Sequence, residues 1–296
     1  MSKGVSSKDV SKIYRALVFG ERVSLAVLDT TALVNEAITR HKLSPVAAAA
    51  LGRSMTATAY LASWLKEESS SLSFLVDGGG AGGKIGVAAD GSLNLRGYIE
   101  HPDIELPARA DGKLDVGGCV GRRGTLTVIR DDGEGIPFVG TSELVSGEIA
   151  EDVSAYFLTS EQRPTAIALG VKIGQDGRCL GAGGLFLQPL PFAGDAAIDF
   201  VQEKISHYSA LSSIIEDSGA QGVLSDFDLK DVTEREVAFL CHCSRERAES
   251  ALLSMGKEDA LALLSEQGKI VVHCHYCNTD HIFDERDVRA LFGEKS

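Results

Sequence analysis

The segments Cys241-His242-Cys243 and Cys274-His275-Tyr276-Cys277 contain four of the six cysteines in this 296-residue chain. Thiolates are soft ligands that suit zinc, and four of them complete a closed tetrahedral site without an open position for catalysis. Residues i and i+2 of an extended segment point to the same face, and the C-x2-C spacing is found in zinc ribbons, where a tight turn brings both sulfurs together. The pairs therefore predict a site with zinc as cofactor and Cys241, Cys243, Cys274 and Cys277 as ligands.

Other interpretations of these cysteines are weaker. Buried thiols can act as small hydrophobic side chains, but pairing at metal-binding spacing disfavours that reading. Structural disulfides are disfavoured because no secretory segment is visible. Four nearby histidines could substitute as ligands, although four thiolates already fill the tetrahedron, so we expect the imidazoles around the site or at the surface. These histidines are His242, His273, His275 and His281.

Composition narrows the class of protein. A hydrophobic content of 44% with 24% charged residues is typical of a soluble globular chain. The net charge of −13 argues against nucleic acid and against anionic membrane surfaces as partners. The polar start from Met1 to Lys12 is unlike a signal peptide, and no apolar run is long enough to span a bilayer. We therefore expect a cytoplasmic protein, in a compartment where thiols stay reduced.

Residues 12–190 are predicted to form an α+β core domain, built mainly of antiparallel strands with embedded helices. Gly-rich and Asp-Gly turns punctuate its β-patterned runs. Ser44-Pro45 opens a long helix to about Lys66, because it supplies an N-cap followed by proline at the first helical position. Polar residues 1–11 predict a disordered start. Strands are expected at 13–19, 22–28, 72–76, 84–89, 93–99, 125–130, 166–173 and 179–187, and further helices at 31–40 and 149–161.

A helical linker is predicted over residues 191–234. Two prolines in Gln188-Pro189-Leu190-Pro191 stop the last strand, and helices are expected at 195–217 and 220–230. The first helix has apolar residues at spacings of three and four, which indicates an amphipathic helix. This apolar face is either simply docked on the core or part of a detachable connector. It comprises Ile198, Val201, Ile205, Tyr208, Leu211 and Ile215.

Residues 235–296 are predicted to form a small metal module. The pattern indicates a strand at 236–240, helices at 244–255 and 257–266, a hairpin around the second cysteine pair, and a closing helix at 284–291. A unit of this size with so few apolar residues usually needs a staple such as a metal. Its expected core is Val237, Phe239, Leu252, Leu253, Leu261, Leu264, Ile270, Val272, Ile282 and Phe283.

The glycine-rich stretch Gly78–Gly83, followed by Lys84-Ile85, nearly matches a phosphate-binding loop. It fails at Ile85, which has no hydroxyl for magnesium, and a β-type run follows where a helix is required. A turn between two strands is the better interpretation. Cys119 and Cys179 stand apart from other cysteines, so we expect them to be core or surface thiols rather than functional ones.

A C-x-C pair, some thirty residues, and a C-x2-C pair near the end of an acidic chain resemble the redox-regulated thirty-three-kilodalton heat-shock chaperonin family. The chain departs from the family pattern in its longer polar N-terminus and in having Cys119 and Cys179 besides the usual four. The other segments similar to the family extend the resemblance from about residue 12 to residue 292. They are Asn35-Glu36-Ala37, 49–53, 78–83, 112–116, 145–148, 160–162, Cys243-Ser244 with Arg247, and 274–278.

The resemblance implies an ATP-independent holdase chaperone, not an enzyme, which binds unfolding proteins and prevents their aggregation under oxidative stress. The reduced form with zinc on the four cysteines is expected to be inactive. Oxidation is expected to pair Cys241 with Cys243 and Cys274 with Cys277, to expel zinc, and to unfold the module and the linker. The implied partners are unfolded client proteins and, in the oxidised homodimer, a second copy. The linker face from Ile198 to Ile215 then becomes the candidate client-binding surface.

Two alternatives predict other behaviour. In a zinc-ribbon interaction module the zinc is purely structural, and its loss only damages the protein. A thiol–disulfide oxidoreductase would use Cys274 and Cys277, but no thioredoxin-like βαβ unit surrounds that pair and the other pair stays unexplained.

Overall fold

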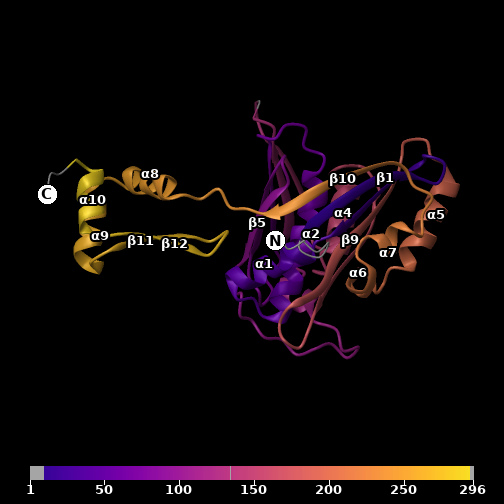
Figure 1. The fold of residues 1–296 in the computed structure, drawn as a ribbon, viewed down its shortest axis with the longest axis horizontal. Helices are drawn as coiled ribbons and strands as arrows, with labels where there is room; N and C mark the ends of the chain where they lie inside the picture. Colours follow the sequence, from indigo (N-terminus) through magenta and orange to yellow (C-terminus); the bar gives the residue numbers. More distant parts are fainter. Residues whose placement is uncertain (1–9, 134, 294–296) are drawn as a thin grey trace, which may run out of the picture. The chain divides into compact units, whose positions relative to one another are not determined.

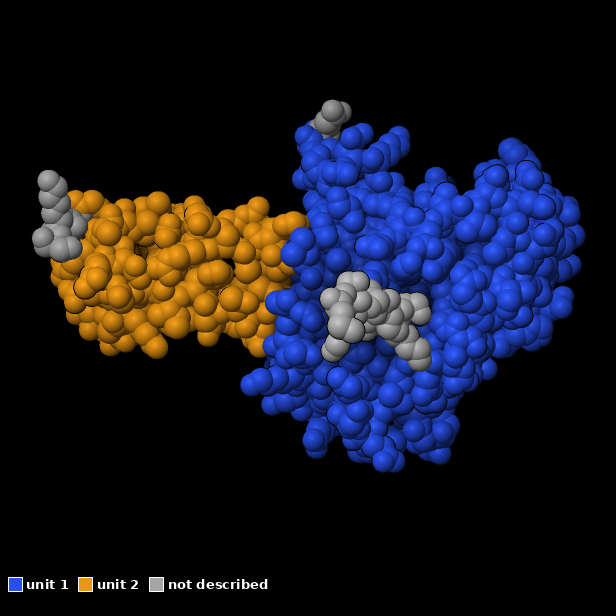
Figure 2. Space-filling model, viewed as in Figure 1, with its two compact units in different colours: residues 1–240 blue, residues 241–296 orange. Residues whose placement is uncertain are grey.

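The computed structural model describes residues 10–133 and 135–293, and the chain divides into two compact units at Leu240/Cys241 (Figure 2). The predicted disordered start falls mostly on residues 1–9, which lie outside the described residues, and Ser11 already belongs to the first strand. The division comes after the boundary expected at residue 235, because the last strand of the first unit extends to Phe239.

A ten-stranded sheet forms the frame of the first unit, in the order β7-β6-β3-β4-β5-β10-β1-β2-β9-β8. Neighbouring strands pair antiparallel except β5 and β10, which are parallel over Ala238–Asn94 and Phe239–Leu95. The predicted α+β class with a mainly antiparallel sheet is therefore confirmed. The strands are β1 (Ser11–Val18), β2 (Val23–Asp29), β3 (Ser71–Asp77), β4 (Ile85–Asp90), β5 (Asn94–Ile99), β6 (Thr125–Asp131), β7 (Phe138–Glu143), β8 (Ala166–Ile173), β9 (Cys179–Pro189) and β10 (Lys230–Phe239).

Helix α2 (Pro45–Ala62) lies at the centre of the main core, beside α1 (Thr31–His41). The Ser44 hydroxyl caps it by accepting from the amide of Ala47 at 3.3 Å. Its run of alanines is buried, and because these side chains are small, strands from both halves of the sheet pack close to the helix. Phe74 of β3 and Phe186 of β9 both belong to this core. α3 (Val116–Val120) and α4 (Ala150–Thr159) also contribute buried side chains to it.

A second core lies on the other face of β2 and β9, under the linker helices α5 (Asp195–Ser206), α6 (Leu211–Ser218) and α7 (Gln221–Leu224) (Figure 1). Strand alternation divides the two cores: Leu25 and Val27 face the linker helices, whereas Ala26 and Leu28 face α2. The linker is therefore docked on the sheet in this structure.

The linker differs from the prediction in two places. The helix expected at 195–217 is broken by a turn at residues 207–210, and the helix expected at 220–230 is only the short α7, because β10 begins at Lys230. Ser206, His207 and Tyr208 have weak helix propensity. Tyr208 is buried, and its hydroxyl donates to Asp226 at 2.7 Å, which favours the turn over a continuous helix.

The second unit contains α8 (Arg245–Met255), α9 (Lys257–Gln267), the hairpin β11 (Ile270–Cys274) and β12 (Thr279–Phe283), and α10 (Glu285–Leu291). These elements match the predicted order. The expected core is wrong in part: Val237 and Phe239 pack in the first unit, because β10 belongs to its sheet, and Leu253 and Ile282 are exposed. No helix among the described residues is long and apolar enough to cross a membrane. The fully buried apolar residues of this unit are Ala248, Leu252, Ala260, Leu264, Ile270, Phe283 and Val288.

Candidate metal centre

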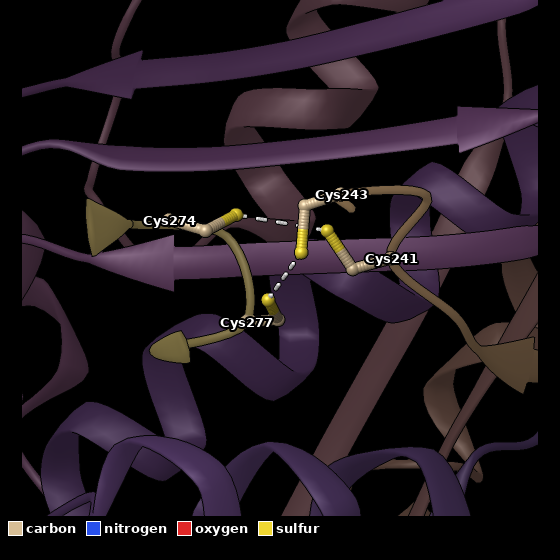
Figure 3. A group of neighbouring side chains, drawn as sticks. All are labelled: Cys241, Cys243, Cys274 and Cys277. Carbon is tan, nitrogen blue, oxygen red and sulfur yellow. Dashed lines mark hydrogen bonds between the residues drawn. The ribbon is translucent and has the colours of Figure 1, made fainter. Parts of the chain in front are cut away.

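Two short loops of the second unit bring the four predicted ligands together (Figure 3). Cys241 and Cys243 precede α8, whose N-cap Ser244 accepts from the amide of Arg247 at 3.3 Å. Cys274 ends β11, and the amide of Asn278 donates to its carbonyl at 2.8 Å, which closes the turn that contains Cys277. The predicted tight turn at the second pair is therefore present.

The sulfur geometry suits a tetrahedral metal. All four Sγ atoms lie within 4.8 Å of one another. Cys241 Sγ is 3.7 Å from Cys274 Sγ, and Cys243 Sγ is 3.3 Å from Cys277 Sγ (Figure 3). Zinc–sulfur bonds of about 2.3 Å in a tetrahedron place sulfurs about 3.8 Å apart. The four cysteines can therefore hold a metal ion with little movement, and as four soft donors they fit zinc.

The electrostatics of the four thiols depend on one another. Burial raises the pKa of the Cys241 and Cys243 thiols, and hydrogen bonding within the group raises that of Cys243 further. Burial also opposes ionisation of Cys277, but hydrogen bonds with Thr279 and the other thiols outweigh it and lower the pKa of Cys277 to about 7. Without a metal, the Cys241 and Cys243 thiols therefore stay protonated at neutral pH, and a bound cation would displace these protons.

The four neighbouring histidines lie outside the group of metal-ligating atoms found among the described residues. His273 Nδ1 is 2.6 Å from Asp280 Oδ1, and its ring packs edge-on against that of His275. His281 Nε2 is buried and has no hydrogen-bond partner among the residues that the structure describes. The positions of these imidazoles agree with the expectation that they surround the site rather than form it.

Arg245, which follows the first cysteine pair, joins three elements of the module. Its guanidinium donates to the carbonyl of Ile282 at 2.9 Å, pairs with Asp287 at 2.8 Å, and lies 4.4 Å from the Phe283 ring centroid. It therefore holds α8 against β12 and α10 and fixes the first cysteine pair relative to the hairpin. Sequence reasoning missed this role, and the only available signal was an arginine next to the Cys243-Ser244 motif.

The remaining sequence candidates lie away from this site. Cys119 and Cys179 are buried in the main core, and burial raises the pKa of their thiols to about 11 and about 12. Such thiols are poor nucleophiles at neutral pH. The glycine-rich turn precedes β4 rather than a helix. It wraps α3 so closely that a Cβ on Gly80 would lie 2.4 Å from the carbonyl oxygen of Cys119. These glycines therefore serve backbone packing.

The predicted client-binding face is mostly covered in this structure. Most of its side chains extend from α5, α6 and the turn between them into the second core, and Ile205 is half-buried. Ile198 is the exception, with 46% of its surface exposed. The buried members are Val201, Tyr208, Leu211 and Ile215.

Comparisons with known proteins agree over nearly the whole chain. A family model described as Hsp33 protein matches residues 11–284. The 33 kDa chaperonin of Acetivibrio thermocellus is 41% identical over 88% of this chain and 90% of its own length. That of Alkaliphilus metalliredigens is 38% identical over 96% and 99%.

The structural comparison covers both units. The crystal structure of the 33 kDa chaperonin, or heat shock protein 33 homolog, from Thermotoga maritima matches with a TM-score of 0.86 at 33% identity. The match covers 95% of this chain and 97% of the Thermotoga chain. With its paired cysteines, its two units and these relatives, the chain belongs to the Hsp33 family of chaperones.

Proposed function

We propose that the chain is a redox-regulated, ATP-independent holdase, with zinc on Cys241, Cys243, Cys274 and Cys277 in its inactive reduced form. The observation that carries the proposal is a tetrahedral set of four thiols in a unit with a very small apolar core. Bound zinc supplies cross-linking free energy, on the order of 10 kcal/mol in small zinc modules. This is comparable with the whole stability of a domain, so loss of the metal unfolds the module.

Oxidation by hydrogen peroxide removes this cross-link, in two steps for each disulfide. A thiolate attacks hydrogen peroxide and becomes a sulfenic acid with release of hydroxide, and a second thiolate displaces hydroxide from that sulfur to form the disulfide. Each disulfide consumes one peroxide, which accepts the two electrons that the two thiolates give up. Pairing Cys241 with Cys243 and Cys274 with Cys277 removes all four ligands and releases zinc. Each such disulfide closes only a tiny loop and restores little stability.

The chain runs from the linker helices through β10 into the second unit, so we expect unfolding of the second unit to affect the linker. Once the second unit unfolds, we expect residues 195–230 to leave the sheet, so that the apolar face from Ile198 to Ile215 and the strand face beneath it can bind unfolding clients. The oxidised form then pairs with a second copy. Hydrogen exchange tests this step, and equal protection of residues 195–230 in the reduced and oxidised proteins would contradict it.

The deciding experiment pairs two measurements on one sample. Zinc release is followed with a chromogenic chelator, and suppression of a client protein's aggregation is measured before and after peroxide with mild heat. We expect both to rise together. Zinc release without a gain in aggregation suppression would favour a purely structural zinc ribbon. A cytoplasmic location fits this cycle, because the cycle begins from reduced thiols.

An oxidoreductase is disfavoured by local structure. Cys274 and Cys277 lie at the tip of an antiparallel hairpin. A redox C-x-x-C motif of the thioredoxin type instead accompanies a βαβ unit.

A further inference from the structure

A cavity of about 470 Å³ lies between the core strands and the start of α6, and its ionisable lining side chains are all cations. Arg53 comes from α2, Lys113 from the loop before α3, and Lys172 from β8. The linker contributes three hydroxyls, from Ser209, Ser212 and Ser213. In a chain with a net charge of −13, such a lining is unexpected from composition alone.

Arg53 retains unused hydrogen-bonding capacity. Its Nη1 donates to Glu148 Oε2 at 2.6 Å and to the Glu148 carbonyl at 3.2 Å, but its Nε is buried without a partner among the described residues. Glu148 also pairs with Arg109 at 2.9 Å, and Arg109 lies 3.7 Å from Asp111. Two arginines therefore share the Glu148 carboxylate. Arg53 Nε has no exposed surface, so the donor left for a ligand is Nη2, which forms no hydrogen bond within the described residues.

The two lysines differ in their pairing. Lys172 Nζ lies 2.5 Å from Glu216 and 3.4 Å from the Ser213 hydroxyl. Lys113 is exposed and forms no ion pair within the described chain. The Lys113 ammonium group is therefore available to an anion in the cavity, while the nearby Asp111 carboxylate accepts from the backbone amide of Lys113 at 3.1 Å.

The rest of the wall is apolar. Most of the other lining side chains are aliphatic, and small-molecule sites of this size combine such walls with a few convergent polar groups. A phosphate dianion matches an arginine fork and lysine ammonium groups. The aliphatic side chains are Ala49, Leu114, Leu169, Val171, Ile173, Ala210 and Leu211.

We propose that this cavity binds a small organic phosphate, with its anionic head at Arg53, Lys113 and Lys172 and its apolar body on the aliphatic wall. Inorganic phosphate alone would use only the cationic part. A ligand with both parts would gain hydrophobic burial as well.

Binding would be coupled to the docking of the linker. Residues 209–213 form one side of the cavity, and a Cβ on Gly170 would lie 2.7 Å from the amide nitrogen of Ser212, so α6 rests directly on β8. A ligand that needs both sides stabilises the docked state by mass action. A more stable docked linker should slow activation by oxidant, and this expectation alone rests on the proposed function. The binding itself does not.

The test uses the reduced, zinc-loaded full chain and follows backbone amide shifts during titration with three probes. Phenyl phosphate carries head and body, inorganic phosphate the head, and phenol the body. We expect phenyl phosphate to shift amides at 169–173 and 209–213 and to bind at least tenfold more tightly than either other probe. Lys113→Glu should weaken it at least tenfold, while Lys66→Glu, an equal charge change at an exposed lysine outside the cavity, should leave it unchanged.

The possible results distinguish a specific site from general charge attraction. Equal weakening by Lys113→Glu and Lys66→Glu would mean general charge attraction and would overturn the site, as would no binding of phenyl phosphate. Slower hydrogen exchange of residues 209–213 with phenyl phosphate supports the coupling. If binding is seen in a protein that never suppresses aggregation, the proposed function fails and the cavity site stands.

Discussion

The sulfur of Cys243 lies 3.3 Å from the sulfur of Cys277, a residue of the other cysteine pair. A metal held by these sulfurs would therefore cross-link two segments with residues 244–273 between them. Closing a loop of this length is worth on the order of 3–4 kcal/mol in the chain-entropy description. Disulfides within each pair leave the two segments without any link. The choice of disulfide partners thus decides whether the oxidised module retains its cross-link.

Disulfide mapping tests this directly. After peroxide treatment with mild heat, we expect peptide mass spectrometry to find Cys241 joined to Cys243 and Cys274 joined to Cys277. The cross-pair bonds would preserve the long loop closure and hold the module folded. If Cys243–Cys277 predominates in protein that suppresses aggregation, unfolding of the module is not the route to activity.

Substitution of a ligand should release zinc and undock the linker without disturbing the main core of the first unit. Cys277→Ser should reduce zinc content from about one ion per chain to well below half, because serine is a poor zinc ligand. Elemental analysis gives the zinc content, and hydrogen exchange should show loss of protection in residues 241–293 and in the linker at 195–230, while the main core of the first unit stays protected. Cys119→Ala, a buried thiol outside the site, is the matched control and should retain full zinc. Zinc loss in both variants would contradict the assignment.

Gly181→Val should undock α6. A Cβ at Gly181 would lie 2.3 Å from the carbonyl oxygen of Ser212 and 2.7 Å from the amide nitrogen of Glu216, so backbone must move. Overpacking of this kind costs about 1–3 kcal/mol. We expect faster exchange in residues 207–224 and aggregation suppression by the reduced protein. Leu180→Ala removes a partly exposed side chain from the neighbouring position and should change neither. An undocked but inactive Gly181→Val protein would separate docking from activity.

Tyr208→Phe should weaken the linker in a pH-dependent way. Burial, followed by the hydrogen bond to Asp226, raises the pKa of Tyr208 above its ordinary value of 10.0. Because folding favours the neutral phenol, its contribution is complete below pH 10 and declines as pH rises through the range between the unfolded and folded pKa values. Loss of one hydrogen bond costs about 1 kcal/mol at pH 7.

Urea denaturation of the first unit at a series of pH values measures this contribution. The wild-type advantage over Tyr208→Phe should shrink above pH 10. Tyr156, whose pKa is also raised by burial, is unchanged in both proteins and cancels in the comparison. An advantage that does not vary with pH would show that Tyr208 acts by packing alone.

The sequence indicated most of what local patterns can encode. Cysteine spacing marked the cluster of four thiols, and apolar runs marked strands such as β2 and β9. Tertiary contacts decided the rest. The break at residues 207–210 depends on burial of Tyr208 against Asp226, and the assignment of Val237 and Phe239 depends on pairing of β10 with β1 and β5. Arg245 has its partners near residues 282–287, and spacing rules cannot detect contacts at that separation. Strand β7 was missed because its sequence, FVGTSE, is mostly polar and exposed, and helix α3 because its five residues include two glycines.

Strand β10 joins the two halves of the large sheet, which are β7-β6-β3-β4-β5 on one side and β1-β2-β9-β8 on the other. On one side it pairs with β1 over most of its length, and on the other it meets β5 through only two residue pairs, at Ala238 and Phe239. Leu240 adds one hydrogen bond to the Leu95 carbonyl at 2.8 Å, and Cys241 follows at once. Fraying that starts at the cysteines therefore reaches the sheet at its weakest junction. Under the proposed function, unfolding of the second unit would therefore act first on the short contact between β10 and β5.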